Sequence, residues 1–206
     1  MNSEIKWIFF DVGSTLFDES AVYENRIEKI IQDNNIDKNE FITKVKQRAQ
    51  INQKPIVSVA EDYNVKIPAW RHDLEVLYPD VKEILPKLYQ KYKLGIIANQ
   101  DFGTEKRLAA FGIRQYFDLV IASAEKGISK PNLRIFQIAL TRANCKPEAA
   151  IMIGDRIDND IVPANKIGMK TVWIKQGPGS SVKPNKIEEY PNYTINNLSE
   201  LLTLLS

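Results

Sequence analysis

Short apolar runs punctuate the chain, and they become regular in its second half. Continuous apolar runs of four to six residues, bounded by polar segments, suit strands that are buried on both faces of a parallel sheet. Runs of this kind cover residues 5–10, 93–98, 119–122, 150–154 and 171–174, with a shorter extended piece at 193–195.

Segments with apolar residues at helical spacing separate these runs. Each is long enough to form the crossover helix that joins two parallel strands with right-handed geometry. The predicted helices cover residues 81–91, 104–111, 132–142 and 160–167, and a last helix covers 198–205. The sequence therefore predicts an α/β fold in which a doubly wound parallel sheet is covered by helices.

A long segment after the first run has a helical pattern only. Its apolar residues recur three and four positions apart, which indicates a block of helices. Because the block interrupts an α/β core, we expect an inserted α-helical cap above the carboxyl ends of the strands, where open sheets bind ligands. The predicted division assigns residues 1–16 and 78–206 to the core and residues 17–77 to the cap.

Composition and charge bear on the partners and the cellular compartment of the chain. The formal net charge of the 206 residues is only +2, with both signs mixed throughout, which does not favour binding to nucleic acid. No apolar stretch reaches the ~18 residues of a membrane span, and residues 1–30 do not resemble a secretion signal. Cys145 is the single cysteine, so we expect it to pack in the core of a cytoplasmic protein.

Two aspartates follow apolar runs at equivalent places. Asp11 follows the first run, and Asp155 follows the run at 150–154. If these strands are neighbours, both carboxylates converge, offering hard oxygen ligands that suit Mg²⁺ and a carboxylate that can act as a nucleophile. The alternative is that each simply caps the helix that follows.

Other polar residues lie at the ends of the remaining strands. Lys130 precedes a predicted helix and could bind the oxygens of a transferred phosphoryl group, and Asn99 offers an amide donor for the same oxygens. Asp158 and Asp160 stand at a helix start, where support of a metal and helix capping are equally open interpretations.

Four segments, taken in the order in which they occur along the chain, resemble the motifs of the haloacid dehalogenase-like hydrolase superfamily. The segments are residues 11–16, 97–99, 130–131 and 154–160, and the helical cap follows the first of them, as it does in that superfamily. The resemblance spans the entire core and implies a phosphatase that acts on a small phosphorylated molecule.

The resemblance also implies roles for individual residues. Asp11 would be the nucleophile, and Mg²⁺ would be held by Asp11, Asp155 and the backbone carbonyl of Gly13. Asp158 or Asp160 would support the metal through water or by hydrogen bonding. Phosphate would be contacted by Lys130 and by residues of the second segment, which include Asn99. Apart from the resemblance, Thr15 could place a hydroxyl or an amide near phosphate, although a threonine after a strand is also an ordinary helix cap.

Two positions depart from the superfamily's pattern. Gly13 stands where its phosphatases usually carry an aspartate that acts as general acid and base, and Ala98 stands where they usually have a hydroxyl that binds phosphate. Because general acid catalysis contributes a factor of ~10²–10⁴, we expect substrates with a good leaving group, or a proton supplied by a cap residue. Release of phosphate from Asp11 should then be slow, and Gly13→Asp should accelerate turnover if the acid is the only deficit.

Candidates for the missing acid are few by sequence. Asp18 is near Gly13 but is expected to cap or hinge the connection to the cap, and His72, the only histidine, is expected to be a half-exposed helix residue. The substrate and the oligomeric state are not predicted.

Three other functions stay open. Haloacid dehalogenases use the same nucleophile without Mg²⁺, but the cluster of aspartates from Asp155 argues for a metal. Phosphonatases combine a small residue at this position with a cap lysine, for which Lys54 is the candidate, although the residues around it do not match. The third alternative is a protein that binds a phosphorylated ligand or a partner without turnover.

Overall fold

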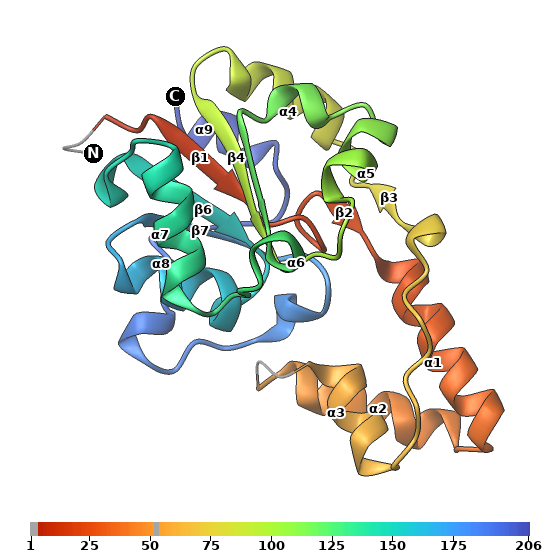
Figure 1. The fold of residues 1–206 in the computed structure, drawn as a ribbon. Coiled ribbons are helices and arrows are strands. Elements are labelled where there is room, and N and C mark those ends of the chain that lie inside the picture. The colour runs from red at the N-terminus through yellow and green to blue at the C-terminus, as the bar shows by residue number, and fades with distance from the viewer. Residues whose placement is uncertain (1–3, 52–53) are drawn as a thin grey trace.

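The computed structural model describes residues 4–51 and 54–206, so residues 1–3 of the predicted core and 52–53 of the predicted cap lie outside it. A six-stranded parallel sheet has the spatial order β5-β4-β1-β6-β7-β8 (Figure 1). The strands are β1 Trp7–Phe10, β4 Lys93–Ala98, β5 Leu119–Ala122, β6 Ala150–Gly154, β7 Lys170–Ile174 and β8 Tyr193–Ile195.

Helices cover both faces of this sheet, which confirms the predicted doubly wound α/β fold. Side chains of α4, α5 and α9 pack on one face, and those of α7 and α8 pack on the other. The core helices are α4 Val81–Tyr89, α5 Thr104–Ala110, α6 Ser123–Lys126, α7 Leu133–Arg142, α8 Val162–Lys166 and α9 Glu200–Leu204.

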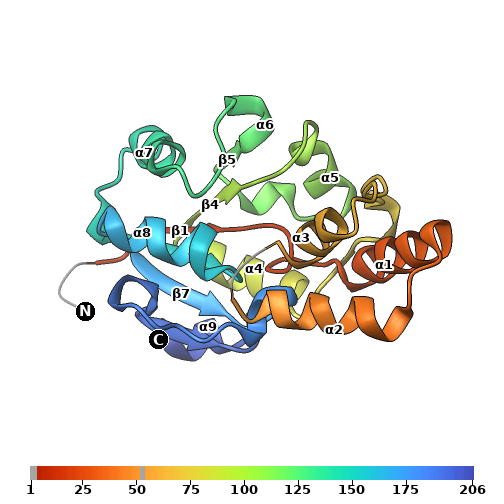
Figure 2. The same cartoon turned by 90° about the horizontal axis from the view of Figure 1, so that it is seen from below.

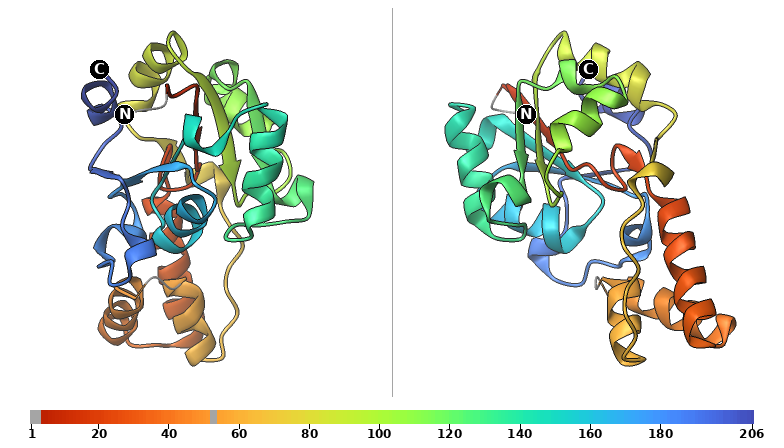
Figure 3. Two further views of the ribbon diagram at one scale, coloured as in Figure 1. Left: turned by 90° about the vertical axis from the view of Figure 1, so that its left-hand side faces the viewer. Right: turned by 45° about the vertical axis from the view of Figure 1, so that its right-hand side comes forward.

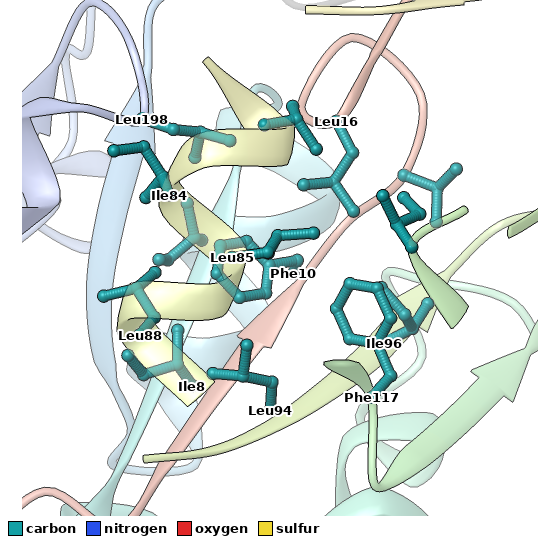
Figure 4. Packing of buried hydrophobic residues seen from close by; sticks show 14 of the residues in the cluster. Ile8, Phe10, Leu16, Ile84, Leu85, Leu88, Leu94, Ile96, Phe117 and Leu198 are labelled. Carbon is teal, nitrogen blue, oxygen red and sulfur yellow. The ribbon is translucent and has the colours of Figure 1, made fainter. Parts of the chain in front are cut away.

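The strand β1 shows how the apolar run serves two cores at once. Successive side chains of a strand point to opposite faces, so Ile8 and Phe10 pack against α4 while Phe9 joins the core on the α7 side. Figure 4 shows Ile84, Leu85 and Leu88 of α4 seated over β1 and β4. All these side chains are at most 2% exposed.

The predicted cap consists of α1 Ser20–Asn34, α2 Lys38–Ala49 and α3 Pro55–Asp62. These helices share a separate apolar cluster around Phe41 and Val59, and they lie beyond the ends of the strands (Figure 2). The chain enters and leaves them through two short antiparallel strands, β2 Phe17–Asp18 and β3 Val76–Leu77. The pair agrees with the predicted division near residues 17 and 77, which stays a prediction.

Sequence patterns located the main elements but missed some local details. The helix expected at 160–167 begins as a π-helical turn, Ile157–Ile161, before α8, and α6 and the β2–β3 pair were not predicted. Short 3-10 helices cover His72–Leu74, Arg114–Tyr116, Pro147–Ala149, Pro178–Ser181 and Ile187–Glu189. Within the described ranges, no helix is long and apolar enough to cross a membrane.

The core packing gives a first test. Ile84 is 1% exposed between α4 and the sheet, whereas Ile187 is 90% exposed, so the two isoleucines form a matched pair. We expect Ile84→Ala to lower the free energy of unfolding by about 2–5 kcal/mol, because it removes buried apolar contacts and leaves a cavity. Ile187→Ala should change it by less than about 0.5 kcal/mol. Urea denaturation measures both, and similar values for the two variants would contradict this packing.

Candidate active site

The pairing of β1 with β6 creates the centre of the site. These strands are parallel neighbours with Phe10 opposite Ile153, so the residues that follow them emerge at the same edge of the sheet. The backbone N–H of Asp11 donates to the carbonyl of Ile153 at 2.9 Å. One carboxylate oxygen from each of Asp11, Asp155 and Asp160 lies within 4.8 Å of the others. The predicted convergence of Asp11 and Asp155 is therefore present.

Lys130 lies inside this carboxylate cluster. Its Nζ is 2.7 Å from Oδ1 of Asp11 and 2.6 Å from Oδ1 of Asp160, and the residue is only 3% exposed. Burial alone would lower the pKa of Lys130, but the two neighbouring carboxylates outweigh burial and raise it. Lys130 is therefore a cation held beside the predicted nucleophile.

Asn99 holds the backbone of Lys130. Its Nδ2 donates to the Lys130 carbonyl at 2.9 Å, and its Oδ1 accepts from the Lys130 N–H at 2.7 Å. Through these two hydrogen bonds Asn99 positions the backbone of Lys130, a role that was not predicted. Direct contact of Asn99 with phosphate stays a prediction. Ala98, which ends β4, is fully buried and presents no hydroxyl.

The two downstream aspartates have different surroundings. Asp160 accepts from Lys130 through Oδ1 and from the Arg156 N–H through Oδ2, at 2.6 and 3.0 Å. Asp158 is paired with the Arg156 side chain at 2.9 Å and is not part of the carboxylate cluster. The position of Asp160 thus suits its expected role in supporting the metal site, whereas Asp158 forms an ion pair with Arg156.

Gly154 makes room for Asp160. A Cβ added at Gly154 would lie 2.3 Å from Cγ of Asp160, closer than such atoms can approach. The end of β6 therefore requires glycine so that the Asp160 side chain can pack against it and reach Lys130.

Negative charge exceeds positive charge at this edge of the sheet. Burial raises the pKa of Asp155 well above its ordinary value, and the neighbouring Asp160 and Asp11 raise it further. Burial also raises the pKa of Asp160 to about 6 although Lys130 opposes the change. A divalent cation bound by oxygen ligands would relieve this repulsion, so the donor set fits Mg²⁺. The position of the Gly13 carbonyl as a further ligand stays a prediction.

A cavity of about 480 Å³ opens above these residues and is shared by core and cap. Asp11, Asp155 and Lys130 line it from the core, and Ser14 does so rather than Thr15, whose side chain is fully buried. The expected phosphate contact of the Thr15 hydroxyl therefore does not fit this arrangement. The cap contributes Tyr23, Arg26, Lys54, Trp70 and His72.

The chain that returns from the cap is fixed against α1. It runs beside this helix (Figures 1 and 3), with the Trp70 ring 5.4 Å from Tyr23 and the Arg26 guanidinium 4.6 Å above Trp70. His72 Nδ1 and Trp70 Nε1 both lie within 3 Å of Oε1 of the buried Glu75, at 2.9 and 2.7 Å. These contacts hold Arg26 and His72 at the cavity. His72 begins a 3-10 helix and its side chain is 36% exposed, as expected of a half-exposed helix residue, but it also lines the cavity.

A glycine-rich turn closes another side of the site. A Cβ at Gly177 would lie 2.4 Å from Oγ of Ser14, and one at Gly179 would lie 2.5 Å from the Asp155 carbonyl oxygen. The 3-10 helix Pro178–Ser181 also contacts α2 of the cap. The sequence predicted only a loop here, because nothing local shows that it folds back over Asp155.

Glu19 is one of the cavity residues that the sequence did not predict. It is 5% exposed, lines the cavity, and accepts hydrogen bonds at Oε2 from Ser14 Oγ at 3.2 Å and from the Tyr23 hydroxyl at 3.0 Å. Burial is the main cause that raises the pKa of Glu19 to about 8, and the Asp11 charge adds to it. Asp18 instead points its Oδ1 at the Ser20 N–H, 2.9 Å away, as expected for a helix cap.

Comparison with known proteins agrees with this geometry. Residues 8–174 match the family described as haloacid dehalogenase-like hydrolase. The chain belongs to this family. As a haloacid dehalogenase-like hydrolase it is 30% identical to the glyceraldehyde 3-phosphate phosphatase of Methanocaldococcus jannaschii, over 98% of this chain and 97% of the relative. It is 31% identical to the protein of that name from Pyrococcus furiosus, over 98% and 93%.

Among solved structures, the magnesium-bound HAD-hydrolase YfnB from Bacillus subtilis has the same fold as this haloacid dehalogenase-like hydrolase. The TM-score is 0.74 at 22% identity, and the match covers 99% of this chain and all of the other. Hydrolases of this family generally use Mg²⁺, and the carboxylate cluster found here is consistent with that use.

The close packing of Asp160 against Gly154 provides a test of the carboxylate cluster. We expect Gly154→Ala to displace Asp160 from Lys130 and to weaken Mg²⁺ binding by about 10-fold to 100-fold, the usual cost of losing support behind a metal ligand. Titration calorimetry with Mg²⁺ alone measures this loss. Thr203→Ala is the control, since Thr203 is exposed on α9, outside the cavity lining. Unchanged Mg²⁺ affinity in Gly154→Ala would contradict the proposed supporting part of Asp160.

The surroundings of Glu19 predict a pH dependence of stability in EDTA. Because the pKa is about 8 in the folded protein and 4.5 ordinarily, folding favours the protonated form. This stabilisation is complete below pH 4.5 and is lost as pH rises towards 8, with a slope of up to about 1.4 kcal/mol for each pH unit.

Glu19→Gln mimics the protonated form, so its unfolding free energy should fall less over the same interval. Glu24→Gln, at an exposed position of α1, should follow the wild type. Urea denaturation at several pH values measures the three proteins. Parallel curves for Glu19→Gln and the wild type would show that Glu19 titrates normally.

Proposed function

We propose that this chain is a Mg²⁺-dependent phosphatase that hydrolyses a small phosphorylated metabolite through a covalent aspartyl-phosphate at Asp11. The observation that carries the proposal is the Asp11 carboxylate at the cavity, bound to the buried Lys130 and beside Asp155. The names of the relatives support the same reaction, since both are phosphatases of a phosphorylated three-carbon compound.

Asp11 is suited to nucleophilic attack. Its side chain is 14% exposed, so it is largely withdrawn from water yet reaches the cavity, and Lys130 holds Oδ1 at 2.7 Å. The other oxygen, Oδ2, would attack phosphorus while the bond to the leaving group breaks. Attack of water on the aspartyl-phosphate then releases phosphate and restores the carboxylate.

Lys130 would serve both steps. In phosphoryl transfer, charge spreads over the three equatorial oxygens, and a fixed cation that is already desolvated stabilises it without reorganisation. Asp160 and the Asn99 amide hold the side chain and the backbone of Lys130, at 2.6 Å and at 2.7–2.9 Å. Their contacts keep the ammonium group in place when phosphate enters.

Asp11 and Asp155 would hold Mg²⁺, with Asp160 in support. When bound, the ion would neutralise phosphate charge and help to orient the phosphoryl group. Lys130 contacts two of the three clustered carboxylates, and Asp155 is left for the metal, which supports this assignment.

The cap side of the cavity would bind the rest of the substrate. Arg26 and Lys54 supply positive charge there, while Trp70 supplies an apolar wall. A volume of about 480 Å³ suits a small metabolite, because pockets for such ligands commonly measure about 300–1,000 Å³. The expected preference for a good leaving group and the cytoplasmic location stay predictions.

Phosphate release tests this function. The purified protein should release phosphate from acetyl phosphate, p-nitrophenyl phosphate or glyceraldehyde 3-phosphate in Mg²⁺. EDTA and Asp11→Asn should each reduce release at least about 1,000-fold, because EDTA removes the cation and Asp11→Asn removes the nucleophile. Asp33→Asn is the control, because this aspartate is 56% exposed on α1.

Activity that survives in Asp11→Asn would exclude the aspartyl-phosphate. A folded protein that binds Mg²⁺ but releases no phosphate from any of the three compounds would favour the non-catalytic binding role instead.

A further inference from the structure

The space beside Gly13 is filled by another residue. A Cβ built at Gly13 would lie 2.5 Å from Oε1 of Glu19 and 2.9 Å from its Cδ and Oε2. The carboxyl group of Glu19 therefore stands where a side chain at position 13 would begin. The site lacks an acid at that position in the sequence, but it has a carboxyl group at nearly the same place in space.

Glu19 is not held there by a helix-capping role. It occupies the N-cap position of α1, yet its side chain makes no capping hydrogen bond. The side chain turns back to the cavity, where both Ser14 Oγ and the Tyr23 hydroxyl donate to Oε2. These contacts fix one oxygen and leave Oε1 as the oxygen nearest Gly13.

The surroundings of Glu19 suit a group that carries a proton. Burial and the nearby charges of Asp11 and Glu75 favour the neutral carboxyl, and they outweigh the hydrogen bonds donated by the Ser14 and Tyr23 hydroxyls, which favour the charged form. The raised pKa of Glu19 agrees with this expectation.

We propose that Glu19 is the general acid and base of this active site, placed by α1 and the cap connection where position 13 supplies no side chain. The proposal rests on the phosphatase function proposed above. It gives the chain a proton donor for alkyl phosphates, whose alkoxide leaving groups require protonation.

Glu19 would give one proton to the leaving group and take one back from water. As the Asp11 oxygen bonds to phosphorus and the ester P–O bond breaks, the Glu19 proton passes to the departing oxygen, which leaves as an alcohol. The Glu19 carboxylate then takes a proton from the water that attacks the aspartyl-phosphate. The P–O bond to Asp11 breaks, phosphate departs, and both carboxyl groups return to their starting states.

The decisive measurement compares leaving groups. kcat/KM reports the steps up to transfer of phosphate to Asp11, and this transfer needs the acid for an alkyl phosphate but little for p-nitrophenyl phosphate. Glu19→Gln keeps the shape and the hydrogen bonds of the protonated carboxyl. We expect it to lower kcat/KM about 100-fold or more for the alkyl phosphate that the wild type hydrolyses fastest, and less than about threefold for p-nitrophenyl phosphate.

Glu24→Gln, at an exposed position of the same helix, should match the wild type on both substrates. Equal losses on both substrates in Glu19→Gln would indicate a merely structural residue, and no loss on either would exclude the role. Both outcomes overturn the proposal while p-nitrophenyl phosphate hydrolysis that depends on Asp11 keeps the phosphatase function.

A relocated carboxyl provides the second test. Glu19→Ala should lose alkyl phosphate hydrolysis, and adding Gly13→Asp to it should restore at least about tenfold, because the vacated space can receive the new side chain. Gly13→Asp alone should not accelerate turnover, since its Cβ overlaps Glu19 Oε1. This differs from the expectation drawn from the sequence. Faster turnover in that single variant, or no recovery in the double variant, would show that Glu19 does not fill the missing role.

A wild type that hydrolyses p-nitrophenyl phosphate through Asp11 but no alkyl phosphate would also overturn the proposal and leave the phosphatase function standing. Inactivity on both classes would overturn the two together.

Discussion

Burial of the Lys130 ammonium group between Asp11 and Asp160 is the interaction on which the site depends. A desolvated charge is costly unless it is paired and hydrogen-bonded, and both conditions are met here by carboxylates at 2.7 and 2.6 Å. The pairing also constrains position 154, because Asp160 can reach the lysine only if Gly154 has no side chain. The strand ends, the glycine and the Asn99 contact therefore form one arrangement.

The same edge of the sheet holds more buried carboxyl groups than Lys130 can pair with. Asp155 and Glu19 are both buried, and the pKa of each is raised. The two carboxyls have different surroundings, since Asp155 belongs to the oxygen cluster that fits a metal while Glu19 is bonded by hydroxyls. Different surroundings allow one carboxyl group to bind a cation and the other to carry a proton.

Gly13 illustrates why a missing side chain in a motif need not mean a missing group. Glu19 is six positions later in the chain, beyond β2, and the turn between them brings its carboxyl to the side of Gly13 that faces the cavity. A sequence comparison made position by position registers a loss at residue 13. In the folded chain the Glu19 carboxyl lies beside Gly13, and acid catalysis depends on where the carboxyl group lies and not on its position in the sequence.

The sequence by itself determined the sheet, the order of its elements along the chain, the strand-end placement of Asp11 and Asp155, and the place of Lys130 before a helix. Apolar periodicity encodes buried strands and helices locally, and parallel topology then aligns their carboxyl ends. Only the tertiary structure decided the surroundings of Glu19, the two-way contact of Asn99 and the closure by Gly177 and Gly179. These depend on contacts between segments distant in sequence, where burial and neighbouring charge set the state of each group, and no local pattern records them.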